Sequence, residues 1–247
     1  MQSVITHTKM ELRLFFRETL ALLFTFIAPA VSFVVFGLMF KTNTYEGGLD
    51  FFQAYIPSMI AIIIFTTAFF SMGLQVVIDR EKGVYKRLRG TPLNQRAIFT
   101  ATIVKGFFAI FVGAIEILLI AKFAFGTSLT EHPFEFLLAL MLCSISFFSI
   151  GFIVSSIATR MQTALGIAMI SMYPMFFLSG ATLPLEVLPE LLQKCAVFVP
   201  LTYVVNVLRD GWNGTLLSSS SLVDIGVLVG ILIISTIIGT KYFRWVD

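Results

Sequence analysis

Charged residues are scarce in this sequence, and the residue types that bind metals are scarcer still. Only 13% of its 247 residues are charged, and it contains two cysteines and two histidines. By contrast, 57% of its residues are hydrophobic and its mean hydropathy is +0.94. A water-soluble fold with this composition would expose far too much apolar surface. The composition therefore excludes an ordinary soluble protein and predicts an integral membrane protein.

Several motifs typical of enzymes are also missing. The sequence has no GxSxG, no HExxH and no glycine-rich phosphate loop that ends in Gly-Lys-Ser/Thr. Cys143 and Cys195 are not spaced as metal ligands or as a CxxC pair, and His7 and His132 add nothing to them. We therefore expect neither an enzyme nor a metal site. Any ATP that the protein uses should be bound by another chain.

Long apolar runs dominate the sequence. A helix needs about 20 apolar residues to cross the hydrocarbon core of a bilayer. About six runs are long enough, and they cover residues 19–40, 52–78, 98–125, 134–158, 163–183 and 222–243. The runs are continuous rather than alternating, which disfavours a barrel. We predict an all-α integral membrane protein with about six transmembrane helices in a single domain, residues 1–247.

The positions of lysine and arginine predict the orientation of the chain. Lys41, Lys122, Lys194 and Arg209 fall on one side of this map, and the remaining lysines and arginines of the 17 fall on the other. The side richer in basic residues is normally cytosolic. Both termini are therefore expected in the cytosol, and the protein is expected in a bacterial cytoplasmic membrane.

Residues 1–18 are predicted to form an amphipathic helix on the membrane surface rather than a secretory signal. Lys9, Arg13 and Arg17 recur every four residues, beside an apolar arc that includes Phe15 and Phe16. This stripe suits the boundary with anionic headgroups. A solvated basic face would give the same pattern, so the sequence leaves both interpretations open.

A basic, turn-rich segment at 79–97 separates the second and third apolar runs. Asp79 to Gly83 extends the second run past the headgroups, residues 84–89 can form a short helix, and Gly90 to Leu93 ends it. Positive-inside topology alone would explain a basic loop. A short helix that is held across the ends of two spans would also act as a lever.

The outer region at 183–221 begins with a stretch too short and too interrupted to span the membrane as one helix. Within 183–201, apolar residues such as Leu188 and Leu192 repeat at helical spacing. We expect a re-entrant element between the fifth and sixth spans. An ordinary interfacial helix is the alternative.

Ionisable residues inside the predicted spans are few. Glu116 is the only acidic residue well inside a span, where it either has a function or reaches the outer interface. Lys105 and Lys122 lie near opposite ends of the same span. We expect both to extend their charges to the interface.

Two groups of motifs resemble those of type 2 ABC exporter permeases. In the first cytosolic loop they are Arg-Glu-Lys-Gly at 80–83, Lys-Arg-Leu-Arg at 86–89 and Thr-Pro-Leu at 91–93. After the fifth span they are Phe-Leu-Ser-Gly at 177–180, Leu-Pro-Leu at 183–185, Leu-Pro at 188–189, Val-Pro-Leu-Thr-Tyr at 199–203 and Leu-Arg at 208–209. Val84 and Tyr85 depart from the family pattern, which often has Thr-Leu and an acidic residue there.

This resemblance implies the permease subunit of an ABC exporter. Such a subunit pairs with a second copy or a homologous permease, mainly through its first and fifth spans, and docks on ABC ATP-binding subunits that carry Mg-ATP. It moves an amphiphilic drug, peptide, lipid or glycan across the lipid bilayer by alternating access. No cofactor on this chain and no nucleic-acid partner are expected. An ion-driven secondary transporter or channel is the alternative, and a non-transporting membrane scaffold is a third possibility.

The same resemblance, together with the residue patterns, gives three sets of candidate residues. The expected ATPase-coupling residues are Glu81, Lys82, Gly83, Val84, Tyr85, Lys86, Arg87, Leu88, Arg89, Thr91 and Pro92. The expected outer gate consists of Gly180, Pro184, Leu188, Pro189, Leu192 and Pro200. The candidate translocation path contains Phe65, Phe69, Phe70, Glu116, Met172 and Phe176, for which lipid-facing bulk is the alternative.

Overall fold

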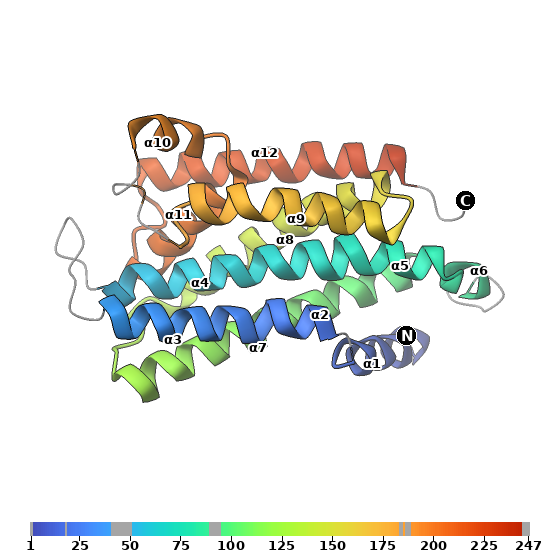
Figure 1. The fold of residues 1–247 in the computed structure, drawn as a ribbon, viewed down its shortest axis with the longest axis horizontal. Helices are drawn as coiled ribbons and strands as arrows, with labels where there is room; N and C mark the ends of the chain where they lie inside the picture. Colours follow the sequence, from blue (N-terminus) through green and yellow to red (C-terminus); the bar gives the residue numbers. More distant parts are fainter. Residues whose placement is uncertain are drawn as a thin grey trace.

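The computed structural model describes residues 2–17, 19–40, 51–88, 95–182, 185 and 189–243, and these residues form helices and turns without a strand. Figure 1 shows the long helices running alongside one another. The elements are α1 (Gln2–Phe15), α2 (Thr19–Leu22), η1 (Leu23–Ile27), α3 (Ala28–Phe40), α4 (Phe51–Thr67), η2 (Ala68–Leu74), α5 (Gln75–Glu81), α6 (Val84–Leu88), α7 (Gln95–Phe125), α8 (Pro133–Ile157), α9 (Met161–Leu178), α10 (Glu190–Ala196), α11 (Pro200–Asn213) and α12 (Ser219–Tyr242).

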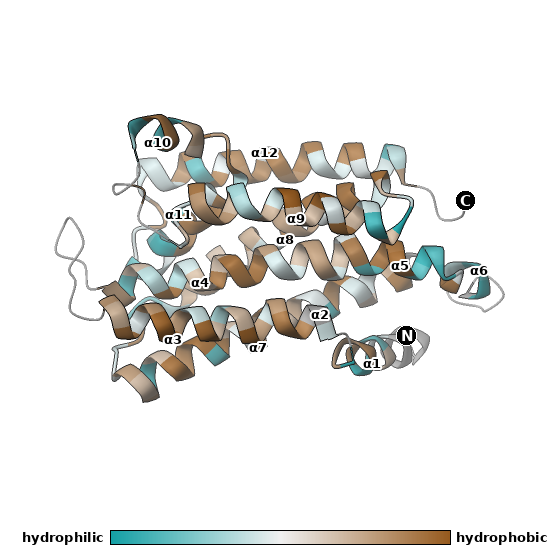
Figure 2. Ribbon diagram, viewed as in Figure 1, coloured by the Kyte–Doolittle hydropathy of each residue, from teal (hydrophilic) through white to brown (hydrophobic). Residues whose placement is uncertain are grey.

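Among the described residues, six helical segments are long and apolar enough to cross a membrane, which confirms the predicted all-helical fold with about six spans. They are Leu23–Phe40, Phe51–Glu81, Ile98–Phe125, Pro133–Ile157, Met161–Leu178 and Ser219–Tyr242. Hydrophobic residues follow these helices along their length, and hydrophilic ones gather around α5 and α6 (Figure 2). The α10 and α11 helices form a pair bent by 83° between the fifth and sixth spans. This pair confirms the expected re-entrant element.

The second span is the centre of the bundle. In the most apolar 18-residue stretch of this span, 94% of the residues are buried. The corresponding shares in the first, fifth and sixth spans are 22%, 17% and 17%. Its α4 part packs against α3, α7 and α11, and its η2 part packs against α8 and α9. The apolar faces that remain exposed on the outer helices are suited to lipid or to a second chain.

Two stretches of the first and second spans are π-helical, an unusual geometry that widens a helix locally. Phe24 of η1 stacks on Phe70 of η2, with ring centres 4.9 Å apart and planes 7° apart. On the other side of η2, Gly151 of α8 lies so close to the Ala68 carbonyl that a side chain would collide with it. The π-helical segment η2 is therefore where the central span is most tightly enclosed.

The N-terminal helix α1 is amphipathic and packs against α7. Phe15 is fully buried beside Ala109, whereas Lys9, Arg13 and Arg17 are exposed. In Figure 1, α1 lies at the same end of the bundle as α6 and the end of α12. The basic stripe predicted from the sequence therefore exists, and it faces away from the bundle.

Lys105 does not extend to the interface as the sequence suggested. It is fully buried, and its Nζ lies 3.0 Å from Oε2 of Glu11 on α1. A buried ammonium needs a nearby opposite charge, and here a residue 94 positions earlier supplies it. The expectation for Lys105 was wrong because α1 covers the part of α7 that carries this residue. Lys122 is exposed, and its interfacial role stays a prediction.

Replacing Glu11 by glutamine should destabilise the protein, because the buried Lys105 ammonium would lose the Glu11 carboxylate. Breaking a buried ion pair in this way costs about 3–5 kcal/mol. The expected result is a lower melting temperature of the detergent-solubilised chain. The double variant Glu11→Gln/Lys105→Met should recover most of the loss, because it also removes the buried charge. Equal melting temperatures for Glu11→Gln and the unmodified protein would contradict the role of this pair.

Candidate functional site

The candidate coupling and gate residues lie at opposite ends of the bundle. Figure 1 shows α6 beyond the end of α5, near α1 and the end of α12, whereas α10 and α11 lie at the other end. The candidate path residues lie between them, in α4, η2, α7 and α9. The chain thus separates the two sets of residues by the length of the second span.

A glycine turn joins the second span to α6. Gly83 has φ +68°, a conformation that residues with a side chain rarely adopt. Its N–H donates to the Arg80 carbonyl at 3.0 Å, and the Lys82 N–H donates to the Ile78 carbonyl at 2.9 Å. The Arg87 N–H in turn donates to the Gly83 carbonyl. This turn ends α5 and starts α6 in a changed direction.

Two side chains at the end of α5 fasten it to the junction of α8 and α9. The buried guanidinium of Arg80 donates from Nη2 to the carbonyl of Ala158, which caps α8. The exposed carboxylate of Glu81 accepts the N–H of Met161 at 2.8 Å, at the first residue of α9. A carboxylate at a helix N-terminus is also favoured by the helix dipole. The fourth and fifth spans are therefore linked directly to the base of α6.

The α6 helix turns Tyr85 inward and its basic residues outward. Tyr85 is buried in a cluster with Val76 and Ile98, against which Phe243 packs. Burial raises the pKa of the Tyr85 hydroxyl well above its ordinary value, and the carboxylates of Asp79 and Glu11 raise it further. Tyr85 is therefore an uncharged anchor at neutral pH.

The outward face of α6 is basic. Lys86 and Arg87 are exposed, and Arg87 Nη2 donates to the Lys82 carbonyl at 3.0 Å. Lys82 is exposed, and Val84 is half-buried. Arg89, Thr91 and Pro92, as well as the side chain of Leu88, lie outside the described residues. The contacts of all these residues with a partner stay predictions. In this single chain, the Tyr85 side chain is buried against residues of the same chain.

At the opposite end, Arg209 of α11 connects three acceptors. Its Nη2 donates to the Ser58 hydroxyl and to the Gly180 carbonyl, both at 3.0 Å, and its Nε donates to the Ala54 carbonyl at 3.3 Å. Gly180 follows α9 with φ +77°, and the Leu185 side chain packs where a Cβ would stand. Arg209 therefore joins the second span, α11 and the turn after the fifth span.

The remaining gate residues belong to the bent pair. Pro189 precedes α10, Leu192 is half-buried on α10, and Pro200 begins α11. The Thr202 hydroxyl donates to the Ala196 carbonyl at 2.9 Å, and the Tyr203 hydroxyl donates to the Val197 carbonyl at 2.7 Å. These bonds tie α10 to the first turn of α11. Pro184 and Leu188 lie outside the described residues.

Most of the candidate path residues pack tightly together. Phe65 lies 4.5 Å from Phe69 and 5.3 Å from Phe176, measured between ring centres. Phe70 stacks on the first span as described above, and Met172 is buried. Glu116 lies apart from them, half-buried on α7. In this single chain, the four side chains other than Phe176 belong to the buried core, the half-buried Phe176 packs against it, and Glu116 does not join them.

Arg80 and Arg209 connect distant segments, and the sequence predicts neither role. Both belong to motifs that resemble those of the family, but the sequence does not indicate their partners. Arg80 is 6% exposed, which is unusual for an arginine and needs compensation by hydrogen bonds. Its position at the end of an apolar run was the available signal. No such signal identified Ala54, Ser58 or Gly180 as partners of Arg209, because they come from distant segments. Within the described ranges, no three His, Cys, Asp or Glu residues gather as metal ligands.

In the part of the chain that the structure describes, the six candidate spans, the short basic helix at one end and the bent helix pair at the other are the features of a multi-pass membrane protein. The profile of the family described as "ABC-2 type transporter" matches residues 2–212. The chain therefore belongs to the ABC-2 type transporter family and is a permease of an ABC transporter.

Several named relatives are similar over much of the chain. It is 27% identical over 245 residues to "Putative transport permease ycf38" of Cyanophora paradoxa, covering 92% of this chain and 83% of that protein. It is 25% identical to "Probable multidrug ABC transporter permease YbhR" of Escherichia coli (strain K12), covering 68% of this chain and 46% of that protein. "Putative transport permease YvfS" of Bacillus subtilis is 23% identical, with 77% of each protein covered.

Replacing Arg209 by lysine should loosen the end of the bundle at α10 and α11. A single ammonium cannot reach two acceptors on α4 and one on the Gly180 turn as a guanidinium does. We expect a loss of about 1.5–3 kcal/mol in stability, seen as a lower melting temperature and faster hydrogen exchange around residues 54–58 and 178–182. Ser58→Ala removes one acceptor and should cost about 1 kcal/mol. A lysine variant no less stable than Ser58→Ala would argue against the threefold contact.

Proposed function

We propose that this chain forms the translocation path of an ATP-driven exporter and that α6 couples it to an ABC ATP-binding subunit. The observation that carries the proposal is the position of α6. The helix is anchored inward by Tyr85, presents Lys86 and Arg87 outward, and continues from a span that Arg80 and Glu81 connect to α8 and α9. A force applied to α6 would therefore reach three spans at once.

The partner subunit supplies the energy in this mechanism. It binds Mg-ATP, and this chain carries no cofactor of its own. An acidic groove on that subunit would match the exposed basic face of α6, and charge-assisted hydrogen bonds at such a contact are stronger than neutral ones. Membership of the ABC-2 family supports such a partner.

The connected spans offer a physical route for alternating access. Movement of α6 shifts α5 and, through Ala158 and Met161, the ends of α8 and α9. The same span continues through η2 to the part of α4 that Arg209 joins to α11. ATP binding would drive this movement, and substrate would leave past α10 and α11.

The proposed membrane is the bacterial cytoplasmic membrane, with both termini in the cytosol. The exposed Lys9, Arg13 and Arg17 of α1 and the exposed Lys86 and Arg87 lie at one end, which supports this orientation. The first and fifth spans are largely exposed, as an interface with a second permease requires. A homodimer and a heterodimer with a homologous permease are both compatible with this surface.

The proposed substrate is an amphiphilic drug, peptide, lipid or glycan. The candidate path residues are mainly aromatic rings and methionine, which adapt to apolar molecules of varied shape. The description of the relative YbhR as a multidrug permease supports the drug class. The path would open only when the core around Phe65 separates or a second chain adds its own surface.

Charge reversal on α6 tests the docking of the partner. The double variant Lys86→Glu/Arg87→Glu should weaken binding of the ATP-binding subunit at least about tenfold, because it places like charges at the contact. The measurement is a titration of the purified subunit against the full-length permease in nanodiscs. Lys194→Glu, at the other end on exposed α10, is the matched control and should bind normally. Equal binding by all three proteins would refute the docking role of α6.

Removing the inward anchor tests coupling and direction together. Tyr85→Ala should lower substrate-stimulated ATP hydrolysis and transport at least about tenfold, because α6 would lose its buried contact. Tyr242→Ala is the control, since that tyrosine is 57% exposed. Transport is measured as ATP-dependent accumulation of an amphiphilic dye in inverted membrane vesicles. Dye uptake in right-side-out vesicles only, or uptake without ATP, would contradict an exporter.

A further inference from the structure

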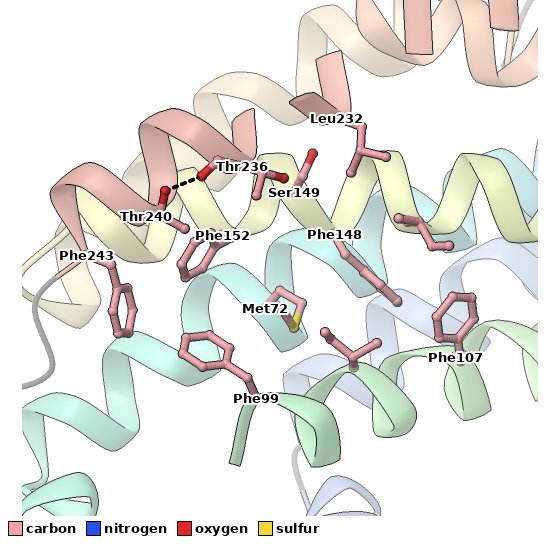
Figure 3. A pocket seen from close by; sticks show the side chains of 12 residues that line it. Met72, Phe99, Phe107, Phe148, Ser149, Phe152, Leu232, Thr236, Thr240 and Phe243 are labelled. Carbon is pink, nitrogen blue, oxygen red and sulfur yellow. Dashed lines mark hydrogen bonds between the residues drawn. The ribbon is translucent and has the colours of Figure 1, made fainter. Parts of the chain in front are cut away.

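A lateral cavity of about 580 Å³ lies between α7, α8 and α12, and Met72 of η2 also lines it. Its volume falls within the range of about 300–1,000 Å³ that is typical of small-molecule sites. Figure 3 shows side chains from these three helices and from η2 turned toward a common space. Those that shape it include Met72, Phe107, Phe148, Ser149, Leu232 and Thr236. None of the candidate residues from the sequence belongs to it.

The lining of this cavity suits a hydrocarbon. Most of its surface is aromatic or aliphatic carbon. The Ser149 hydroxyl donates to the Ser146 carbonyl at 2.6 Å, and the Thr240 hydroxyl donates to the Thr236 carbonyl at 2.8 Å, a bond drawn in Figure 3. Both hydroxyl groups therefore already donate a hydrogen bond within their own helices. An apolar occupant loses no hydrogen bond by entering and removes apolar surface from water.

Glycines allow the walls to stand where they do. A Cβ at Gly106 of α7 would lie 2.6 Å from the Phe148 ring, and a Cβ at Gly239 of α12 would collide with the Phe152 ring. One end of the cavity is closed by the rings of Phe99, Phe152 and Phe243. The distance between any two of these ring centres is about 5 Å. The cavity is thus bounded by packed rings that are held in defined positions.

The cavity opens sideways. The α12 helix packs along α8, whereas α7 packs mainly on α1 and α4, and the lining residues Ile145 and Thr236 are exposed. Toward the interior, the cavity is bounded by Met72 of η2 and by α8, which meets η2 backbone to backbone at Gly151 and Ala68. A molecule can therefore enter the cavity from the surrounding membrane.

We propose that this cavity binds one acyl chain of a resident phospholipid of the cytosolic leaflet and that this lipid stabilises the coupling position of α6. The leaflet rests on the orientation given under the proposed function. Exposed Lys241, in the last turn of α12 beside Thr240, provides a positive charge for the phosphate of the headgroup. The occupant is a fixed component of the transporter rather than its cargo.

Phe243 carries the link to α6. Its ring is part of the triad that closes the cavity, and it also packs against the cluster that holds Tyr85. The guanidinium carbon of Arg80 lies 5.9 Å from the centre of the same ring. An acyl chain that packs against the triad therefore steadies the ring on which both the anchor of α6 and the end of α5 rest.

Photolabelling of the full-length chain in vesicles tests the site directly. The probe is phosphatidylglycerol with a diazirine on one acyl chain, mixed with phosphatidylethanolamine, and the labelled residues are mapped by mass spectrometry. We expect Leu232 and Thr236 to be labelled at least about fivefold more than Ile233 and Ile237, which are exposed on the same helix. Thr236→Trp should fill the cavity and abolish the preference, whereas Ile237→Trp should retain it.

The outcomes separate this inference from the proposed function, because labelling needs neither ATP nor a partner. Equal labelling of all four positions in the unmodified chain would mean ordinary surrounding lipid and would overturn the site. Displacement of the label by a transported amphiphile would overturn the resident role. In the assembled transporter, Thr236→Trp should lower stimulated ATP hydrolysis about threefold relative to Ile237→Trp. Equal hydrolysis by the two variants would overturn the link to α6.

Discussion

Arginine side chains hold the second span near both of its ends. Near its start, Arg209 of α11 donates to the Ala54 carbonyl and the Ser58 hydroxyl, and near its end the span's own Arg80 donates to the Ala158 carbonyl. Taking a guanidinium out of water is costly unless its donors are paired, so these contacts restrict where the span can lie. Since 94% of its apolar window is buried, its position determines the packing of the spans around it.

The middle of this span combines tight packing with an irregular helix. In η2, Phe70 stacks on Phe24 of the first span, and the Ala68 carbonyl faces Gly151 of α8. A π-helical stretch changes the hydrogen-bond pattern of the backbone without ending the helix. A small change in this stretch would rotate the two halves of the span relative to each other. The packing on both sides of η2 would transmit that rotation to the first and fourth spans, because interiors are close-packed.

The spans were predictable from sequence because hydrocarbon thickness sets their length, whereas contacts between spans were not. Prolines and the interrupted apolar pattern also predicted the element that became α10 and α11. Lys105 was assigned wrongly because its partner, Glu11, lies on a helix whose position on α7 no local pattern encodes. The inward position of Tyr85 depends likewise on Val76, Ile98 and Phe243 from three different segments. The lateral cavity depends on glycines of α7 and α12 meeting rings of α8.

The two ends of the second span are held with different strength, and this difference constrains how a movement could pass along it. The Glu81 contact with Met161 is a single bond at an exposed carboxylate, and a bond of this kind is worth about 1.5–3 kcal/mol at most. At the other end, Arg209 joins three acceptors, and Thr202 and Tyr203 fasten α10 to α11. The Arg80 bond to Ala158 supports the Glu81 contact, so a movement of α6 would be carried to the ends of both α8 and α9. Under the proposed function, the outer gate would open by displacement of α10, α11 and the Gly180 turn as one unit, because several bonds join these elements to one another.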